Sequence, residues 1–382
     1  MFALSHRKAL LGAVLLGTAA GAFAATTSLQ DLGSGLVESG TGASETFSNP
    51  SPAVGTGSLA DMVERVGPAV VQIEARMGNQ TSEMAFGGLP FGGDPRSPFG
   101  GRGDGQGEMA VGSGFVIDAS GIVVTNNHVV ENAQVITVKL SDGRELPGRV
   151  LGRDPKTDLA VVKIEGGGPF EAIAWGDSDH ARVGDDIFAV GSPFGLGNTV
   201  TSGIVSARGR EIGAGPYDDF LQVDAPINSG NSGGPLFNAA GHVIGVNTAI
   251  FSPSGGNVGI GFAIPSRLAQ SVVTQIVKEG HVSRGRIGVA LQPLNAEIAQ
   301  QLGLSDARGA LIADVETGGP AAAAGLQRGD VVTSFNGRPI PDSRELARAV
   351  ASAKPGSTLT ADIIRDGHDS RVNLRIAEMS DS

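Results

Sequence analysis

The stretch "INSGNSGGPLF", residues 227–237, combines a serine with closely spaced glycines and a proline. It contains Gly230-Asn231-Ser232-Gly233-Gly234, which fits G-x-S-x-G, the pattern of a nucleophile elbow between a strand and a helix. The same residues are also compatible with a glycine-rich turn that carries a different kind of nucleophilic serine, or with a turn alone. An elbow belongs to an α/β sheet, so its context decides the fold class.

The residues after Ser232 argue against the elbow. An elbow requires a helix directly after the serine, and its acid and histidine partners later in the chain. Here Pro235 and the turn-like "NAAG" follow, and no helical pattern appears before residue 266. The downstream histidines His242, His281 and His368 fall at a strand start, an interdomain joint and a hairpin turn.

Composition limits the remaining possibilities. The 382 residues suffice for two or three domains, and 40% hydrophobic with 4% aromatic residues predicts cores of Val, Ile, Leu and Ala. The net charge of −11, without a Lys/Arg cluster, argues against nucleic acid and anionic membrane surfaces as partners. The chain has no cysteine, which excludes disulfides, thiolate metal sites and a cysteine nucleophile, and leaves the redox compartment open.

The N-terminus resembles a secretory signal. Arg7 and Lys8 precede the apolar run "ALLGAVLLGTAAGAFA", which ends in an A-x-A pattern at Ala24. An uncleaved membrane anchor is the alternative. The run is shorter than the about 20 residues of a spanning helix and contains Gly and Thr, so we expect residues 1–24 to be a cleaved signal peptide. Residues 25–57 are rich in Ser, Thr and Gly and predict a flexible linker.

Residues 58–280 predict an all-β barrel or sandwich. Short apolar runs bounded by Gly, Pro, Asn or Asp recur closely, among them "AVVQI", "GIVVTN", "LAVVKI", "DIFAVG" and "HVIGVNTAI". Residues 78–109 interrupt them with a Gly-, Pro- and Phe-rich segment that is either a docking element or a mobile loop. "SRLAQSVVTQIVKEG" then predicts a helix that ends at Gly280 and presents an apolar face. That face comprises Leu268, Ala269, Val272, Val273, Ile276 and Val277.

Residues 285–379 predict a second, smaller domain of mixed strands and helices. "IGVAL" and "GALIADV" read as strands, and "NAEIAQQLGL" and "DSRELARAVASA" as helices, the latter with Asp342 and Glu345 as capping residues. Asn336-Gly337 and Asp366-Gly367 are typical of hairpin turns. A unit of this size and composition is expected to fold as a separate domain.

The order of three residues identifies a different kind of serine site. His128 follows an apolar strand in "TNNHVV", Asp158 precedes another in "KTDLAVVKI", and Ser232 comes last. This is the order of the catalytic residues in chymotrypsin-type barrels. An imidazole activates the serine hydroxyl, a carboxylate orients the imidazole, and the amides of Gly230 and Ser232 can face a common oxyanion. Gly233 and Gly234 are expected to leave space for a peptide substrate.

Taken singly, each of these residues would more often be structural. A lone histidine after a strand is usually a surface residue, and an aspartate before an apolar run is usually a turn acceptor. The chain has no H-E-x-x-H motif, no G-x-x-x-x-G-K-[ST] motif and no S-x-x-K motif around a better serine. We therefore expect no metal and no small-molecule cofactor.

The chain resembles the HtrA (Deg) family of secreted serine proteases. The resemblance rests on "GSGFVIDASGIVVTNNHVV", "DPKTDLAVVKI", "AVGSPFGLGNTVTSGIVSA", "APINSGNSGGPLFN" and "GIGFAIPS", which span most of residues 58–280. It implies a mainly β fold, with a chymotrypsin-like double β-barrel followed by a smaller α+β PDZ domain. It also implies that His128 is the general base, Asp158 orients it and Ser232 is the nucleophile, with the amides of Gly230, Asn231 and Ser232 forming the oxyanion hole.

The same resemblance implies roles for residues around this site. Ile227, Ile250 and Phe251 match positions of the primary specificity pocket, which implies small aliphatic residues before the cleaved bond. Arg210 matches a loop arginine that relays activation to the active site.

"RIGVAL" resembles the carboxylate-binding loop of bacterial PDZ domains. The resemblance implies that the amides of Ile287, Gly288 and Val289 bind a peptide C-terminus as an added strand. Leu346 and Val350 would line the groove. "IGV" can also be a plain strand.

The resemblance finally implies a periplasmic enzyme that cleaves unfolded or misfolded envelope proteins without ATP, as a homotrimer or a multiple of one. Degradative members of the family carry two PDZ domains, whereas one PDZ unit fits here before Ser382. One alternative is a stress-signalling protease anchored at the inner membrane and facing the periplasm. Another is a peptide-binding chaperone without catalysis.

Overall fold

The computed structural model describes most of the chain after residue 57. The expected signal peptide and linker (residues 1–57) and nearly all of the expected insertion (residues 78–108) lie outside the described residues. Within the described part, no helix has both the length and the apolar character needed to cross a bilayer. The described ranges are 58–77, 109–192, 198–215, 217–228, 230–250, 257–304 and 306–379.

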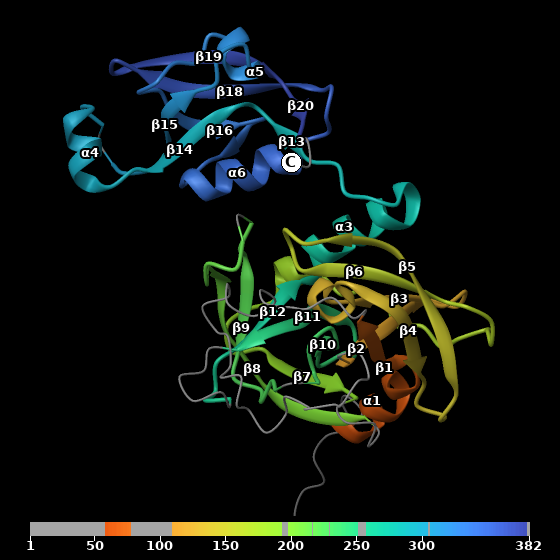
Figure 1. Ribbon diagram of the computed structural model, residues 1–382. Coiled ribbons are helices and arrows are strands. Elements are labelled where there is room, and N and C mark those ends of the chain that lie inside the picture. Colours follow the sequence, from red (N-terminus) through yellow and green to blue (C-terminus); the bar gives the residue numbers. More distant parts are fainter. Residues whose placement is uncertain are drawn as a thin grey trace, which may run out of the picture. The chain divides into compact units, whose positions relative to one another are not determined.

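Six antiparallel strands close into a first barrel in the order β1-β2-β3-β6-β5-β4 (Figure 1). β6 is buried at nearly every position, because its inner side chains fill the barrel and helix α3 (Ser266–Glu279) packs against it from outside. The strands are β1 (Val70–Met77), β2 (Met109–Asp118), β3 (Ile122–Thr125), β4 (Ala133–Lys139), β5 (Glu145–Asp154) and β6 (Leu159–Ile164).

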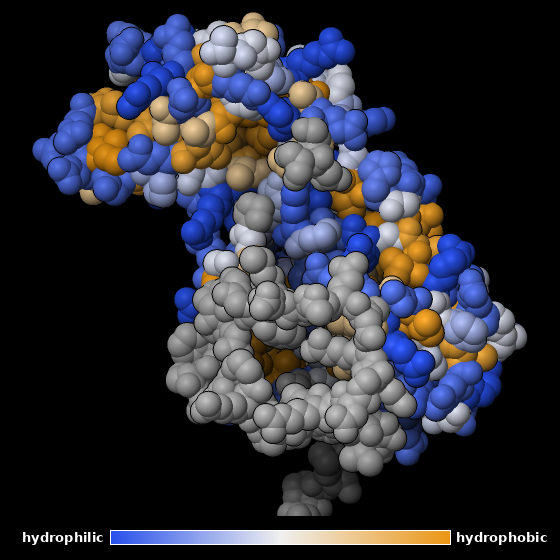
Figure 2. Space-filling view, in the orientation of Figure 1, coloured by the Kyte–Doolittle hydropathy of each residue, from blue (hydrophilic) through white to orange (hydrophobic). Residues whose placement is uncertain are grey.

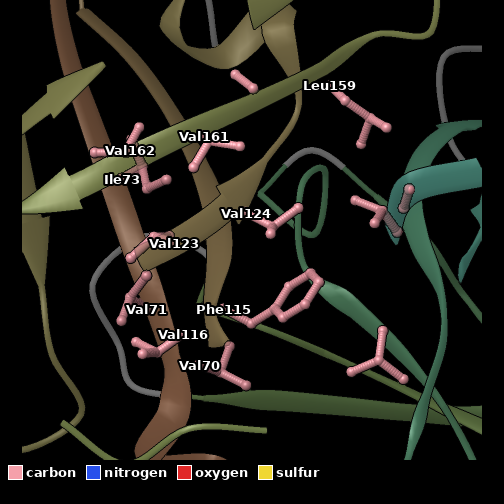
Figure 3. Packing of buried hydrophobic residues seen from close by; sticks show 14 of the residues in the cluster. Val70, Val71, Ile73, Phe115, Val116, Val123, Val124, Leu159, Val161 and Val162 are labelled. Carbon is pink, nitrogen blue, oxygen red and sulfur yellow. The ribbon is translucent and has the colours of Figure 1, made fainter. Parts of the chain in front are cut away.

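The core of this barrel consists largely of β-branched side chains. Val70, Val71 and Ile73 of β1 lie among valines of β2, β3 and β6 (Figure 3). One large ring, Phe115, contacts the edge of Trp175 with the ring centroids 5.4 Å apart. The predicted core of small aliphatic residues is thus confirmed, and such residues suit the interior of a small barrel.

A second barrel closes in the order β10-β11-β12-β9-β8-β7. The turn that carries Ser232 leads directly into a strand of this barrel, so the expected double barrel is confirmed and the elbow is excluded. The strands are β7 (Asp186–Gly191), β8 (Thr199–Arg210), β9 (Phe220–Val223), β10 (Pro235–Asn238), β11 (Val243–Ile250) and β12 (Gly261–Pro265).

The predicted helix after the second barrel is α3. It ends at Gly280, whose φ of 79° provides the left-handed cap. Ala269, Val272, Val273 and Ile276 are buried as expected. Val277, at the margin of the predicted apolar face, is 45% exposed, because the helix turns it away from the barrels.

Several short elements complete the two-barrel part. Helix α1 (Leu59–Val66) was not predicted, although Ser58 and Asp61 form a reciprocal capping box at its start. A one-turn helix, α2 (Asn127–Val130), follows β3. The 3₁₀ turns within the described ranges are η1 (Gly67–Ala69) and η2 (Ser178–His180).

The C-terminal unit has a six-stranded antiparallel sheet and its own apolar core. Both predicted hairpin turns are present, with Asn336 and Asp366 at φ values of 49° and 51°. Asp342 caps helix α6 as expected, whereas the carboxylate of Glu345 binds Arg348. The elements are β13 (Gly285–Arg286), β14 (Val289–Pro293), α4 (Ala296–Gln301), β15 (Ala310–Val315), α5 (Pro320–Ala323), β16 (Val331–Phe335), β17 (Arg338–Pro339), α6 (Ser343–Ala351), β18 (Thr358–Arg365), β19 (His368–Arg375) and β20 (Ala377–Glu378).

Candidate active site

The three residues expected to act together come from both barrels. His128 lies in α2, immediately after β3, and Asp158 directly precedes β6. β3 and β6 are paired neighbours in the first barrel, and their register places Thr125 opposite Ala160. Ser232 lies in the turn before β10 of the second barrel.

His128 and Asp158 form a close pair. Nδ1 of His128 lies 2.8 Å from Oδ2 of Asp158, and the His128 amide donates to Oδ1 at 3.0 Å. A carboxylate only accepts hydrogen bonds, so Nδ1 carries the proton and Nε2 is left as the basic nitrogen. The His128 side chain is 43% exposed, so its ring is accessible to a substrate.

The electrostatics of the pair favour the charged imidazole. Burial by itself would lower the pKa of His128. The hydrogen bond to Asp158, the charge of Asp158 and the charge of Glu131 oppose this effect and together raise the pKa above its ordinary value of 6.5. An imidazolium formed during a reaction would be stabilised in the same way.

Asp158 is fixed through its backbone as well as its carboxylate. Its φ of 55° is unusual for a residue other than glycine. Its carbonyl accepts hydrogen bonds from the Asn127 amide (3.1 Å) and from Nδ2 of Asn126 (2.9 Å). The segment that contains His128 therefore also orients Asp158.

Thr248 connects the two barrels at this site, and sequence reasoning missed it. Its hydroxyl donates to Oδ2 of Asp158 at 2.7 Å, and its carbonyl accepts from the Ser232 hydroxyl at 3.5 Å. Thr248 lies in β11, where an Asn-Thr pair interrupts an apolar strand. That interruption was the only available signal, because the pairing partner of a strand threonine is set by tertiary structure.

The turn around Ser232 packs tightly against both barrels. The Gly233 amide donates to the Asn247 carbonyl at 2.8 Å, and Gly233 has a φ of 82°. A Cβ on Gly233 would lie 2.3 Å from the Ser113 carbonyl oxygen, and one on Gly234 would lie 2.5 Å from the Val190 oxygen. These close approaches are sufficient to explain both glycines, and the expected role of leaving space for a substrate stays a prediction.

The amides expected in the oxyanion hole differ in their partners. The Asn231 amide donates to the Asn228 carbonyl at 3.0 Å, within the turn. The Asn231 carbonyl accepts from the Gly234 amide at 2.9 Å. Since C=O and N–H of one peptide point in opposite directions, this bond turns the Ser232 amide away from the interior of the turn.

Ile227 and Ile250 both lie beside Gly261 and belong to the apolar cluster of the second barrel. Ile250 ends β11 and is paired with Gly261 of β12, and a Cβ on Gly261 would meet Ile227 at 2.8 Å. Ile227 is buried, and its carbonyl accepts from Nδ2 of Asn257 at 2.9 Å. Phe251 lies outside the described residues.

Arg210 lies at the end of strand β8 and not in a loop, which corrects its expected local structure. Its Nε donates to Oε1 of Gln222 at 2.8 Å, on the neighbouring strand β9. This bond lies within the β8–β9 ladder, in which Arg210 is paired with Phe220 and Gln222 with Ala207. No contact of Arg210 with His128, Asp158 or Ser232 is seen in the part of the chain that the structure describes.

The expected peptide-binding residues lie where α6 runs along β14 in the C-terminal unit. Gly288 has a φ of 74°, and its carbonyl accepts from the Glu316 amide at 2.9 Å. Ile287, Leu346 and Val350 are buried in the core of this unit. Val289 begins β14, and apolar surface is visible around β14 and α4 (Figure 2).

No group of three or more His, Cys, Asp or Glu side chains within the described ranges is arranged to bind a metal ion. The two closed barrels and the His128–Asp158 pair, with Ser232 linked to it through Thr248, define a trypsin-like serine endopeptidase. Residues 112–246 match the family model of the trypsin-like peptidase domain, and residues 285–376 match that of the PDZ domain.

Comparison with known proteins defines the family more closely. A probable periplasmic serine endoprotease DegP-like of Rhizobium meliloti (strain 1021) is 47% identical over 352 residues, covering 84% of this chain and 70% of that protein. The periplasmic serine endoprotease DegP of Escherichia coli (strain K12) is 46% identical over 345 residues, covering 85% and 73%. The solved HtrA-type protease AlgW with tripeptide has a TM-score of 0.72 and 39% identity, covering 85% of this chain and 99% of that one. The chain belongs to the HtrA family of DegP-like serine endoproteases.

Proposed function

We propose that Ser232 is the nucleophile, His128 the general base and Asp158 the residue that orients the imidazole. The Ser232 hydroxyl turns from the Thr248 carbonyl to Nε2 of His128, loses its proton to it and attacks the peptide carbonyl. His128 then protonates the leaving amine, and water hydrolyses the acyl-enzyme by the same route. The observation that carries this proposal is the chain of contacts from Ser232 through Thr248 and Asp158 to His128.

The proposed oxyanion hole consists of the amides of Gly230 and Ser232. The Asn231 amide, which the family resemblance also suggested, donates to Asn228 and is therefore left out of the proposal. Ile227, Ile250 and Phe251 are proposed to line the pocket for the residue before the cleaved bond. Their aliphatic and aromatic character suits small apolar side chains.

We further propose that the protein acts in the periplasm on unfolded or misfolded envelope proteins, without ATP. The names of the relatives from Rhizobium meliloti and Escherichia coli support the compartment. The PDZ match supports binding of peptide C-termini to Ile287, Gly288 and Val289, beside Leu346 and Val350. Arg210 is proposed to couple that binding to the active site.

Digestion of casein by the wild type and by Ser232→Ala tests the proposal. We expect the variant to lose nearly all activity, by about 10⁶-fold, as when the serine of a comparable catalytic unit is removed. It should still bind unfolded casein. Equal digestion by both proteins would refute the assigned nucleophile, and binding without turnover by the wild type would favour a chaperone.

The proposed assembly is a homotrimer or a multiple of one, as the family resemblance implies. Multi-angle light scattering of the full chain at micromolar concentration measures the mass directly. A trimer mass or a multiple of it is expected, and a monomer alone would contradict the proposal.

A further inference from the structure

Ser113 of β2 makes two hydrogen bonds to the turn that carries Ser232. It is fully buried, and its hydroxyl donates to the Gly230 carbonyl at 2.5 Å. Its own amide donates to the Ser232 carbonyl at 2.8 Å. One residue of the first barrel thus binds the carbonyls on both sides of Asn231.

We propose that Ser113 is a positioning residue that sets the conformation of the oxyanion turn. This inference rests on the proposed role of Ser232 as nucleophile. Gly230 has a φ of 102° and no side chain, so its own covalent structure leaves its backbone free to rotate. The hydrogen bond from Ser113 fixes the Gly230 carbonyl and thereby the orientation of the adjoining peptide groups.

The Ser113 hydroxyl is itself oriented. The Ser192 amide donates to it at 2.8 Å and occupies one of its lone pairs. The hydroxyl proton is directed to the Gly230 carbonyl, the acceptor that the described residues provide for it. The hydroxyl therefore bridges the end of β7 and the oxyanion turn, two segments far apart in the sequence.

The backbone of Ser113 provides a rigid base for this contact. Its carbonyl accepts from the Thr125 hydroxyl at 2.7 Å, and the residue is paired with Gln72 across the β1–β2 ladder. Gly233 approaches the same carbonyl too closely to accept a Cβ. Movement of the turn relative to β2 is restricted on the side of Gly230 and on the side of Gly233.

Removal of the hydroxyl should impair the transition state more than substrate binding. The oxyanion forms only during the reaction, so a misplaced donor lowers kcat and leaves KM nearly unchanged. Ser113→Ala leaves a partly buried carbonyl, that of Gly230, and a buried amide, that of Ser192, without their partner. We expect a loss in kcat of about 10- to 100-fold from such unpaired groups.

Ser266 offers a matched control at a distance from the site. It is also fully buried, its hydroxyl donates to the Gly176 carbonyl at 2.8 Å, and it accepts from the Ser178 amide at 3.1 Å. Ser266→Ala therefore removes an equivalent pair of hydrogen bonds, one donated and one accepted by the hydroxyl, at the start of α3. Its effect measures what the loss of a buried bridging hydroxyl does to the fold alone.

The experiment compares Ser113→Ala, Ser113→Cys and Ser266→Ala in the full chain. For each we measure kcat, KM, the melting temperature and the inhibition constant of a peptide aldehyde, which forms a tetrahedral adduct with the serine. We expect Ser113→Ala to lower kcat and to weaken aldehyde binding by the same factor, with KM unchanged. Ser113→Cys, with a weaker donor, should fall between the wild type and alanine. Ser266→Ala should lower the melting temperature only.

Two results would overturn the positioning role. One is equal kcat and aldehyde affinity in Ser113→Ala and Ser266→Ala. The other, which applies even if Ser113→Ala does not fold, is wild-type kcat in Ser113→Cys with wild-type aldehyde affinity. If Ser232→Ala kept full activity, the assignment of the nucleophile would fail independently of any result at Ser113.

Discussion

Burial lowers the pKa of His128, whereas Asp158 and Glu131 raise it. The pH dependence of kcat/KM reports the resulting pKa. Because the neutral imidazole is the base, kcat/KM should rise with pH, with a midpoint above the ordinary 6.5. Asp158→Asn removes the charge and the acceptor that raise this pKa. We expect its midpoint to fall and its rate to drop by about 10⁴-fold, as in triads of this type.

The pH–rate profile is measured with a neutral peptide substrate, and Glu131→Gln serves as a mild control. Removal of the Glu131 charge should lower the midpoint slightly without a large loss of rate. A rate independent of pH from about 5 to 8 would show that another group accepts the proton. The stability of the fold depends on pH in the opposite direction from the rate. Because the pKa of His128 is raised in the folded state, its protonation stabilises the fold, and this contribution is complete at a pH below the unfolded-state pKa. That contribution is lost as the pH rises through the folded-state value.

Thr248 should contribute to the rate through the carboxylate that it binds. Thr248→Val keeps the branched shape but removes the hydroxyl that donates to Asp158. Hydrogen bonds to charged groups are worth more than neutral ones, so kcat/KM should fall about 10- to 100-fold. Thr248→Ser keeps the donor and should recover most of the rate. If valine and serine variants had equal rates, the hydroxyl would have no part in orienting Asp158.

Helix α3 should stabilise the barrels through one face. Ile276 is buried against them, whereas Val277 is 45% exposed. Ile276→Ala should lower the free energy of unfolding by about 2–5 kcal/mol, because it removes buried methylene groups and leaves a cavity. Val277→Ala should change it by less than about 0.5 kcal/mol. Urea unfolding, followed by tryptophan fluorescence, measures the free energy of unfolding of both variants. Equal losses of stability in the two variants would contradict the assignment of Ile276 to the buried face of α3.

The strands that the sequence did not predict, β5 and β10, both lack a continuous apolar run. β5 has two glycines and a proline within it and largely alternates between partly buried and exposed residues, so it lacks the apolar run of the other strands. β10 has four residues and begins with Pro235, which reads as part of a turn. Strands such as β6 and β11 were predicted because they are buried on both faces and therefore apolar throughout.

Within the site too, the residues that could be predicted are those that a local sequence pattern marks. His128, Asp158 and Ser232 stand beside recognisable strand ends and a glycine-rich turn, so local patterns locate them. Thr248 and Ser113 lie inside strands. Their importance depends on the Asp158 carboxylate that the first barrel places beside Thr248, and on the Gly230 carbonyl that the second barrel places beside Ser113. Contacts of that kind arise from tertiary structure and leave little trace in the local sequence.

At the scale of the whole molecule, the proposed PDZ site should regulate cleavage. Peptides with a free, apolar C-terminus should bind near Ile287–Val289 and raise cleavage of a separate reporter substrate. A ligand shifts an equilibrium between idle and active states only by its differential affinity for them. Tenfold activation requires about 1.4 kcal/mol of coupling, within the range typical of allostery.

Amidated peptides of the same sequence provide the control, because they lack the carboxylate. Reporter cleavage is measured over a titration of each peptide, and binding is measured in parallel by fluorescence anisotropy. Equal activation by amidated and free-acid peptides would rule out carboxylate capture. Arg210→Ala should abolish activation without weakening peptide binding.

His128 and Asp158 belong to the first barrel, whereas Ser232 and Thr248 belong to the second. With the roles proposed above, neither barrel by itself has both a nucleophile and a base. A chain in which only one barrel has folded therefore lacks part of the set of groups that the proposed mechanism needs. The proposed site is complete only when both barrels have folded and docked, with Thr248 in contact with Asp158. Latency during biogenesis is thus a property of the chain topology itself.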